Sequence, residues 1–423
     1  MFSKNILKNG LRVVTVPMKN TKTVTVLVVV ETGSKYETKK NNGISHVLEH
    51  MFFKGTKKRP NTQLLASEID EIGGEHNAFT SEEFTGYYAK AASCHAHLLF
   101  DLISDMFLNS KLAEQELSLE KNVICEEINM YQDIPMHYVG YLWEQLLYGD
   151  QPAGWLTIGT KENVQGFSRE DLMNYLEKSY VAANTIIIIA GEIDPQKALT
   201  EAKNFFGSTR VAPKPRKKKV LEKQNEPQIL LQTKKTDQSH FCLGVRGYSI
   251  HHPDYYPLEV LTAVLGGGMS SRLFIAVRER RGLAYYVHTS FESYTDHGYL
   301  VAQAGVDNNN TEEAVKVILS EFRKAKEQKV QEKELNKAKE YLKGRLTLNL
   351  ETSDEYAFWL AGQEVVRGEM LTEEQIFQKI DAVSSADVQR VANDIFGNSK
   401  LNLAVIGPQK EKGGLGKILN FKF

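Results

Sequence analysis

Residues 185–191 read TIIIIAG and residues 401–407 read LNLAVIG, and these two stretches decide the fold. Each is a run of mostly aliphatic residues closed by glycine, which is typical of a strand buried on both faces. Each follows a helical segment that opens with Ser-x-x-Asp, at Ser168 and at Ser384, a pattern that marks a capped helix start. The same order of features therefore occurs twice, at an offset of roughly 212 to 216 residues, and predicts two copies of one domain.

The earlier part of each copy follows the same plan. In the first copy, a β-rich run at residues 23–30 leads through a polar turn into a helical stretch that starts near Gly43. In the second copy, a run at residues 240–245 leads into a helical stretch that ends at Gly266. β-runs that alternate with amphipathic helices indicate an α+β or α/β class.

Between the copies lies VAPKPRKKKVLEKQNEPQ, residues 211–228, with three prolines and no periodicity. We interpret it as a linker, which gives domains at residues 1–210 and 229–423. Its basic cluster suits an acidic partner such as nucleic acid, but a solvated linker is the favoured interpretation.

The overall composition excludes several functions. The chain has 52 Lys plus Arg and 53 Asp plus Glu among 423 residues, so it has no global field for nucleic acid or an anionic membrane. No apolar stretch approaches the ~20 residues of a membrane span. No leader peptide is visible, and the odd number of cysteines, three, suits reduced thiols. We therefore expect a cytoplasmic protein without nucleic-acid or membrane partners.

The stretch GISHVLEHMFFKGT, residues 43–56, carries a candidate metal site. His46 and His50 are four residues apart, so on a helix they share one face and can bind a single ion. Glu49 lies beside them and can approach a metal-bound water without being a ligand.

A third ligand is expected elsewhere, because a catalytic zinc usually takes three protein ligands and keeps one open position. In the predicted helix at residues 113–133, Glu120 and Glu127 are two turns apart and share a face, whereas Glu126 points about 100 degrees away. Carboxylates on a helix are usually just solvated, but the histidine motif favours a role for this pair. By contrast, His95 and His97 do not share a helix face and make a poor metal site.

His46, Glu49 and His50, followed by Glu127, resemble the inverted-zincin signature of the pitrilysin, insulinase and mitochondrial processing peptidase family. The resemblance covers nearly the whole chain. It implies that His46, His50 and Glu127 bind one Zn²⁺ per chain, that Glu49 is the general base, and that Glu120 is a carboxylate outside the ligand set that supports the site.

The same resemblance assigns residues that bind substrate. GGEHNAFTSEEFTGYY, residues 73–88, is similar to the family strand whose Asn and Ala, here Asn77 and Ala78, pair with the substrate backbone. In the second copy, Arg278 and Tyr285 match the family residues that reach the scissile bond from a domain without zinc.

The second copy has lost the metal chemistry. The apolar stretch at residues 257–262 aligns with residues 46–50, and Tyr341 aligns with Glu127. One half is thus expected to bind metal and the other to shape the chamber.

The resemblance implies an α+β fold of two homologous tandem domains, each a mostly antiparallel sheet packed with helices, that form half of a clamshell. It also implies a zinc metalloendopeptidase that hydrolyses peptides or unfolded segments inside a chamber. In this mechanism Glu49 deprotonates a zinc-bound water. Family members of this length pair, so a homodimer is expected, or a heterodimer with a related chain. The alternative is a non-catalytic peptide-binding or assembly subunit with the same fold.

Overall fold

The computed structural model describes residues 2–420, and the chain packs into two compact units. Each unit draws most of its residues from one half of the sequence and a short segment from the other half. Unit 1 comprises residues 1–129, 155–218 and 348–370, and unit 2 comprises residues 130–154, 219–347 and 371–423.

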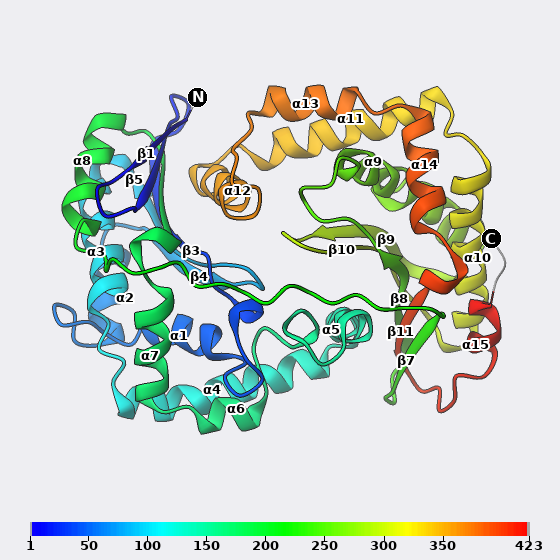
Figure 1. Cartoon of the computed structure of the whole chain (residues 1–423), viewed down its shortest axis with the longest axis horizontal. Helices are drawn as coiled ribbons and strands as arrows, with labels where there is room; N and C mark the ends of the chain where they lie inside the picture. Colours follow the sequence, from blue (N-terminus) through cyan, green and yellow to red (C-terminus); the bar gives the residue numbers. More distant parts are fainter. Residues whose placement is uncertain (1, 421–423) are drawn as a thin grey trace. The chain divides into compact units, whose positions relative to one another are not determined.

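Unit 1 contains a six-stranded sheet in the order β1-β2-β6-β3-β5-β4 (Figure 1). Neighbouring strands are antiparallel except for β2 and β6, which are parallel. The strands are β1 Ser3–Ile6, β2 Arg12–Pro17, β3 Thr23–Val30, β4 Glu75–Thr80, β5 Thr85–Ala92 and β6 Thr185–Gly191.

Helices cover both faces of this sheet, which explains why every residue of β6 is buried. Helix α12 packs against β3 and β6, and α3 and α8 pack against β3, β5 and β2. The helices of the first half of the sequence are α1 Ile44–Phe52, α2 Thr62–Asp70, α3 Ala96–Asn109, α4 Glu114–Asp133, α5 Pro135–Tyr148, α6 Lys161–Gly166, α7 Arg169–Ser179 and α8 Pro195–Phe206.

Unit 2 contains a five-stranded sheet in the order β7-β11-β8-β10-β9, in which β7 and β11 are parallel and the other neighbours antiparallel. This is the order of unit 1 without β1, and β6 and β11 occupy the same place in it. The strands are β7 Gln228–Thr233, β8 Gln238–Arg246, β9 Ala284–Ser293, β10 Gly298–Asp307 and β11 Asn402–Gly407. The prediction of an α+β protein with two related domains is confirmed.

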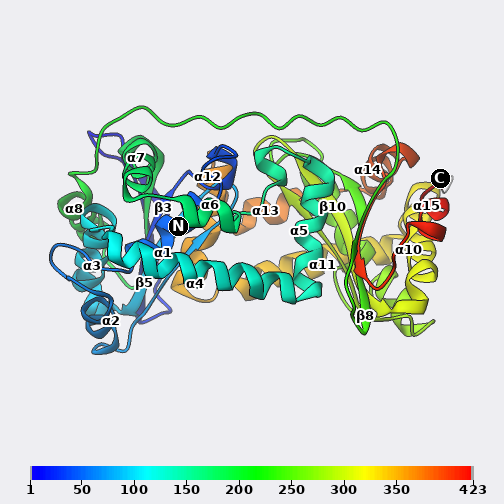
Figure 2. The same ribbon diagram turned by 90° about the horizontal axis from the view of Figure 1, so that it is seen from below.

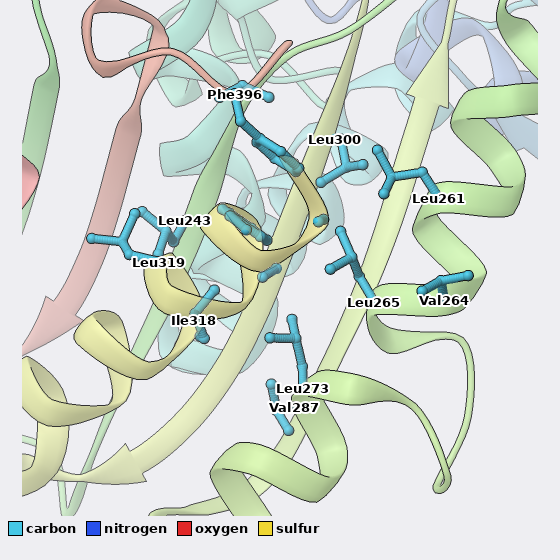
Figure 3. Close-up of a cluster of buried hydrophobic side chains, with 14 of the residues drawn as sticks. Leu243, Leu261, Val264, Leu265, Leu273, Val287, Leu300, Ile318, Leu319 and Phe396 are labelled. Carbon is cyan, nitrogen blue, oxygen red and sulfur yellow. The ribbon is translucent and has the colours of Figure 1, made fainter. Parts of the chain in front are cut away.

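The largest core of unit 2 lies between its sheet and helices α9 and α10 (Figure 3). Leu243, Val287 and Leu300 of the sheet meet Leu261 and Leu265 of α9 there. The helices of the second half of the sequence are α9 Tyr255–Gly266, α10 Thr311–Glu327, α11 Glu332–Asn349, α12 Ser353–Val366, α13 Glu373–Asp381, α14 Ser385–Ile395 and α15 Gly413–Leu419.

Each unit takes one sheet-covering helix from the other half of the sequence. Helix α5 places Val139, Leu142 and Trp143 on the sheet of unit 2. Helix α12 places Ala357 and Leu360 on the sheet of unit 1. The domain boundaries at residues 1–210 and 229–423 describe repeats in the sequence and stay a prediction, because packing groups the chain differently.

The segment at residues 211–228 has neither helix nor strand up to the start of β7 (Figures 1 and 2). Two of its lysines form ion pairs with buried carboxylates of unit 1: Lys214 with Glu31 and Lys217 with Glu83. The side chain of Lys217 is only 16% exposed, so the prediction of a solvated linker is wrong at this residue. In residues 2–420, no helix is both long and apolar enough to cross a bilayer.

Candidate metal centre

Helix α1 carries the histidine motif, and its first turn is held in place by a buried carboxylate. Glu37 accepts hydrogen bonds from the backbone N–H groups of Gly43, at 2.7 Å, and Ser45, at 2.9 Å. Burial raises the pKa of Glu37, and the hydrogen bonds from Ser45, Gly43 and Asn42 oppose that rise. Gly43 has φ +97°, and a Cβ there would lie 2.7 Å from the carbonyl oxygen of Ile158. Only glycine therefore lets α1 start against this loop.

The three predicted ligands converge. Nε2 of His46 lies 3.7 Å and Nε2 of His50 lies 3.4 Å from Oε2 of Glu127. One donor atom from each residue lies within 4.8 Å of the other two. The two imidazoles come from successive turns of α1 and the carboxylate from α4, which runs as one helix from Glu114 to Asp133, one residue shorter than predicted.

This donor set fits a catalytic zinc ion. With bonds of about 2.0 to 2.2 Å, tetrahedral zinc ligands lie about 3.3 to 3.6 Å apart, close to the two distances measured from Glu127. Two imidazoles and one carboxylate leave a fourth position open. The side chains are 12%, 21% and 23% exposed for His46, His50 and Glu127, so solvent or substrate can reach that position.

Glu120 lies outside the ligand set and holds the second histidine, as the resemblance implies for a supporting carboxylate. Its Oε1 lies 2.9 Å from Nδ1 of His50, and its Oε2 lies 2.5 Å from Nζ of Lys54. A carboxylate on Nδ1 fixes the ring orientation and leaves Nε2 for a metal. Burial would raise the pKa of Glu120, but His50 and Lys54 lower it below its usual range. Glu126, in contrast, points to solvent and accepts a bond from Asn129.

The two histidines differ in their electrostatics. Burial, followed by the charge of His50, lowers the pKa of His46 to about 4, against a smaller opposing effect of Glu127. Burial also acts to lower the pKa of His50, but hydrogen bonds to Glu120 and Glu127 raise it to about 9. Nδ1 of His46 is buried and has no hydrogen-bond partner in residues 2–420. Such a site is costly for the fold and suits a functional role.

Glu49 lies on the same helix between the two histidines and is largely buried. Burial raises the pKa of its carboxyl group, and a hydrogen bond donated by the Thr80 hydroxyl to Oε2 opposes the rise. A carboxylate with a raised pKa is a stronger proton acceptor than an exposed one, as a general base requires.

Asn77 and Ala78 lie in β4, which is the edge strand of the unit 1 sheet. In β4, Asn77 faces Tyr88 of β5 and Ala78 faces Tyr87, and β4 pairs with no second strand in residues 2–420. Helix α1 packs against this strand. An extended peptide could thus add to the free edge of β4 beside the metal ligands.

Arg278 and Tyr285 belong to unit 2 and contact each other. Arg278 lies in the π-helix Phe274–Glu279 (η5), and its guanidinium carbon is 5.8 Å from the centre of the Tyr285 ring and 5.0 Å from that of Phe274. Tyr285 is 74% exposed at the start of edge strand β9. Their role in substrate binding stays a prediction.

Three residues of this site were missed by sequence reasoning: Glu37, Lys54 and Thr80. Lys54 lies just beyond the end of α1 at Phe52, four residues after His50, so a helical pattern continued past that end was the one available signal for it. Glu37 and Thr80 contact α1 from other parts of the chain, and no local sequence pattern predicts these contacts.

No second metal cluster forms elsewhere in residues 2–420. His97 pairs with Glu201, His240 bonds the hydroxyl of Tyr286, and Cys242 is buried. Among the described residues of unit 2, no three His, Cys, Asp or Glu side chains come together as His46, His50 and Glu127 do.

The chain matches known proteins along most of its length. The family model of insulinase, peptidase family M16, matches residues 12–160, and a model described as the peptidase M16 inactive domain matches residues 166–342. The zinc protease YmxG of Bacillus subtilis is 37% identical over 408 residues, which cover 96% of this chain and 98% of that protein. A zinc protease of Streptomyces coelicolor is 31% identical over 97% of this chain and 90% of its own length.

A solved structure has the same fold. The crystal structure of a protease from Helicobacter pylori superposes with a TM-score of 0.90 at 26% identity and covers 96% of this chain and 100% of that chain.

Proposed function

Since the chain belongs to the insulinase family of peptidases, M16, we propose that it is a zinc-dependent endopeptidase that cleaves peptides or unfolded segments. The observation that carries the proposal is the convergence of His46, His50 and Glu127 beside the buried carboxylate of Glu49. Both relatives compared above are named zinc proteases, which favours zinc over cobalt or manganese, ions that such a donor set also accepts.

When bound, the metal supplies Lewis-acid chemistry at the scissile carbonyl and at the attacking water. Glu49 accepts a proton from that water and passes it to the nitrogen that leaves. Glu120 keeps the His50 ring oriented, and Lys54 keeps Glu120 ionised.

The substrate pairs with the free edge of β4 at Asn77 and Ala78, so that main-chain hydrogen bonds hold it in register beside the metal centre. Recognition through the backbone suits extended peptides of varied sequence rather than folded proteins.

The first test measures cleavage of a mixed peptide library by the full chain with and without a chelator. We expect chelator-sensitive cleavage that returns when zinc is added. Glu49→Gln should retain zinc and fold but lose cleavage, whereas Glu126→Gln, on the exposed face of α4, should behave like the wild type. Cleavage that survives in Glu49→Gln would overturn the mechanism. A wild-type chain without chelator-sensitive cleavage would favour the alternative, a non-catalytic peptide-binding or assembly subunit.

We also propose that two chains associate, and that Arg278 and Tyr285 of one chain complete the metal centre of the other and stabilise the developing oxyanion. Light scattering should then give the mass of a dimer. Mixing two inactive variants, His46→Leu and Arg278→Ala, should restore about a quarter of the wild-type activity, since half of the dimers are mixed and each has one complete site. No recovery on mixing would exclude this arrangement.

We expect the enzyme to act in the cytoplasm without nucleic-acid or membrane partners.

A further inference from the structure

The Glu49 carboxylate has a single hydrogen-bond donor in the part of the chain that the structure describes. The hydroxyl of Thr80 donates to Oε2 of Glu49 across 31 residues of sequence. Thr80 is the last residue of β4, and its backbone is held in register opposite Thr85 of β5.

This contact fixes one oxygen of a largely buried carboxylate, and the other oxygen has no donor among residues 2–420. A carboxylate on a flexible glutamate side chain rotates freely unless a neighbour holds it, and general base catalysis requires the accepting oxygen within hydrogen-bond reach of the proton. We propose that Thr80 is a positioning residue that orients Glu49 toward the attacking water. The inference rests on the proposed function, because it assigns a role within the same site.

The place of Thr80 in the sheet adds to its role. It lies three residues after Asn77 in the strand whose free edge is proposed to pair with the substrate. One rigid strand thus sets both the register of the peptide and the orientation of the base. When the same strand holds both the peptide and the Glu49 carboxylate, the entropic cost of bringing them together in the transition state is lower.

The competing explanation is that Thr80 only stabilises the fold. The hydroxyls of Tyr87 and Tyr180, which lie near Glu49 in the interior, bond each other at 2.8 Å and show that buried hydroxyls in this region also serve packing. The two explanations differ in what a variant without the hydroxyl does to kcat.

The kinetic test compares Thr80→Val, which keeps the shape and removes the hydroxyl, with Thr80→Ser, which keeps the hydroxyl. We expect kcat of Thr80→Val to fall by about ten- to hundredfold, the value of a hydrogen bond to a charged group, with KM and zinc content unchanged. Thr80→Ser should recover most of kcat. The matched control is Thr85→Val, which removes a buried hydroxyl that donates to the carbonyl oxygen of Thr32 and should lower Tm without lowering kcat. Equal kcat in Thr80→Val and the wild type, or equal losses in the Val and Ser variants, would overturn the proposal.

A second measurement needs no metal and no activity. In the metal-free chain, Thr80→Val and Glu49→Ala should be coupled by about tenfold in the unfolding equilibrium constant, because each removes one partner of the same contact. Independent effects would show that the contact is absent. If the cycle shows coupling but the wild-type chain cleaves nothing, the proposed function fails while the contact stands, and the catalytic role of Thr80 falls with it. If Glu49→Gln is inactive but Thr80→Val is fully active, only the role of Thr80 fails.

Discussion

Helix α1 of unit 1 and helix α9 of unit 2 occupy equivalent places in two sheets whose strand order agrees apart from β1, and each packs against an edge strand of its sheet. Both helices bury apolar residues, which in α1 include Val47, Leu48 and Met51. They differ in that α1 also carries the partly buried His46, Glu49 and His50, whereas the buried side chains of α9 include Leu258 and Leu261. The fold therefore does not require the polar residues of α1.

The comparison also shows that the metal centre places a polar side chain in surroundings that disfavour it. In α1, burial lowers the pKa of His46 to about 4, and the buried Nδ1 of this ring has no hydrogen-bond partner in residues 2–420. In α9, Leu258 and Leu261 belong to a continuous apolar core. Polar groups that are buried at such cost are kept for chemistry rather than for stability.

The largest effect is expected when a predicted metal ligand of α1 is replaced by an apolar residue like those of α9. His46→Leu should abolish zinc binding and lower cleavage by at least about a thousandfold, because the Lewis-acid contribution of several kcal/mol is lost with the ion. The free energy of unfolding of the metal-free chain should stay the same or rise, since an apolar group replaces an imidazole whose buried Nδ1 has no hydrogen-bond partner in residues 2–420. Metal analysis, cleavage assays and urea unfolding measure the three quantities.

The control is His97→Leu, which replaces an exposed histidine that pairs with Glu201 and should leave zinc binding and cleavage intact. A large loss of stability in metal-free His46→Leu would mean that the polar residues of α1 hold the fold after all.

The converse change is in α9. Leu261→Ala removes a fully buried side chain (Figure 3) and should lower the free energy of unfolding by about 2 to 5 kcal/mol. Zinc bound per folded chain should not change, because the metal centre lies in unit 1. Met269→Ala, at a 74% exposed side chain, should have little effect on unfolding. Loss of zinc from folded Leu261→Ala would show that the core of unit 2 shapes the metal centre.

Much of this architecture follows from local patterns. Strand β3 covers residues 23–30 as predicted, and both Ser-x-x-Asp segments form capping boxes, at Ser168 and Ser384. Helical periodicity predicted that His46 and His50 share one face and that Glu120 and Glu127 share another, and the family resemblance singled out Glu127 as the third ligand. These features depend on neighbours three to seven residues apart, which periodicity reports well.

Features that depend on distant packing could not be predicted. Helices α5 and α12 both bury apolar residues against a sheet, but nothing in the sequence of such a helix says which of two sheets it covers. The contacts of Thr80 with Glu49 and of Lys217 with Glu83 join elements far apart in sequence. Only the folded chain brings such partners together.

A smaller change tests the residue that supports the metal centre. Glu120→Gln should weaken zinc binding by about ten- to hundredfold, because a neutral amide holds Nδ1 of His50 less well than a carboxylate does. Lys54→Met should weaken it less, since Lys54 contacts Glu120 and not the histidine. Competition with a chromogenic chelator measures both affinities. A larger effect of Lys54→Met than of Glu120→Gln would contradict the view that Lys54 acts on His50 only through Glu120.

The two capping boxes offer a comparison in which the halves should agree. In each, the serine hydroxyl accepts the backbone N–H of the aspartate, and the aspartate side chain accepts the backbone N–H of the serine. Ser168→Ala and Ser384→Ala should each lower the free energy of unfolding by about 1 kcal/mol. A difference of several kcal/mol between them, measured by urea unfolding, would show that the repeats are not equivalent even in local structure.

The smallest effect concerns the pH dependence of the same caps. Hydrogen bonds from Ser384, and then the contact with Arg390 at 3.0 Å, lower the pKa of Asp387 from 3.8 to about 2, and bonds from Ser168 lower the pKa of Asp171. A carboxyl group whose pKa is lowered by folding stabilises the folded chain above its unfolded pKa, and this stabilisation is lost as the pH falls through its folded pKa. Asp387→Asn should therefore reduce stability at pH 7 and lose that effect between about pH 4 and pH 2. Asp171→Asn should follow the same direction with a weaker dependence on salt, because no arginine pairs with Asp171 in residues 2–420. A pH-independent effect of Asp387→Asn would mean that its carboxylate does not cap α14 in solution.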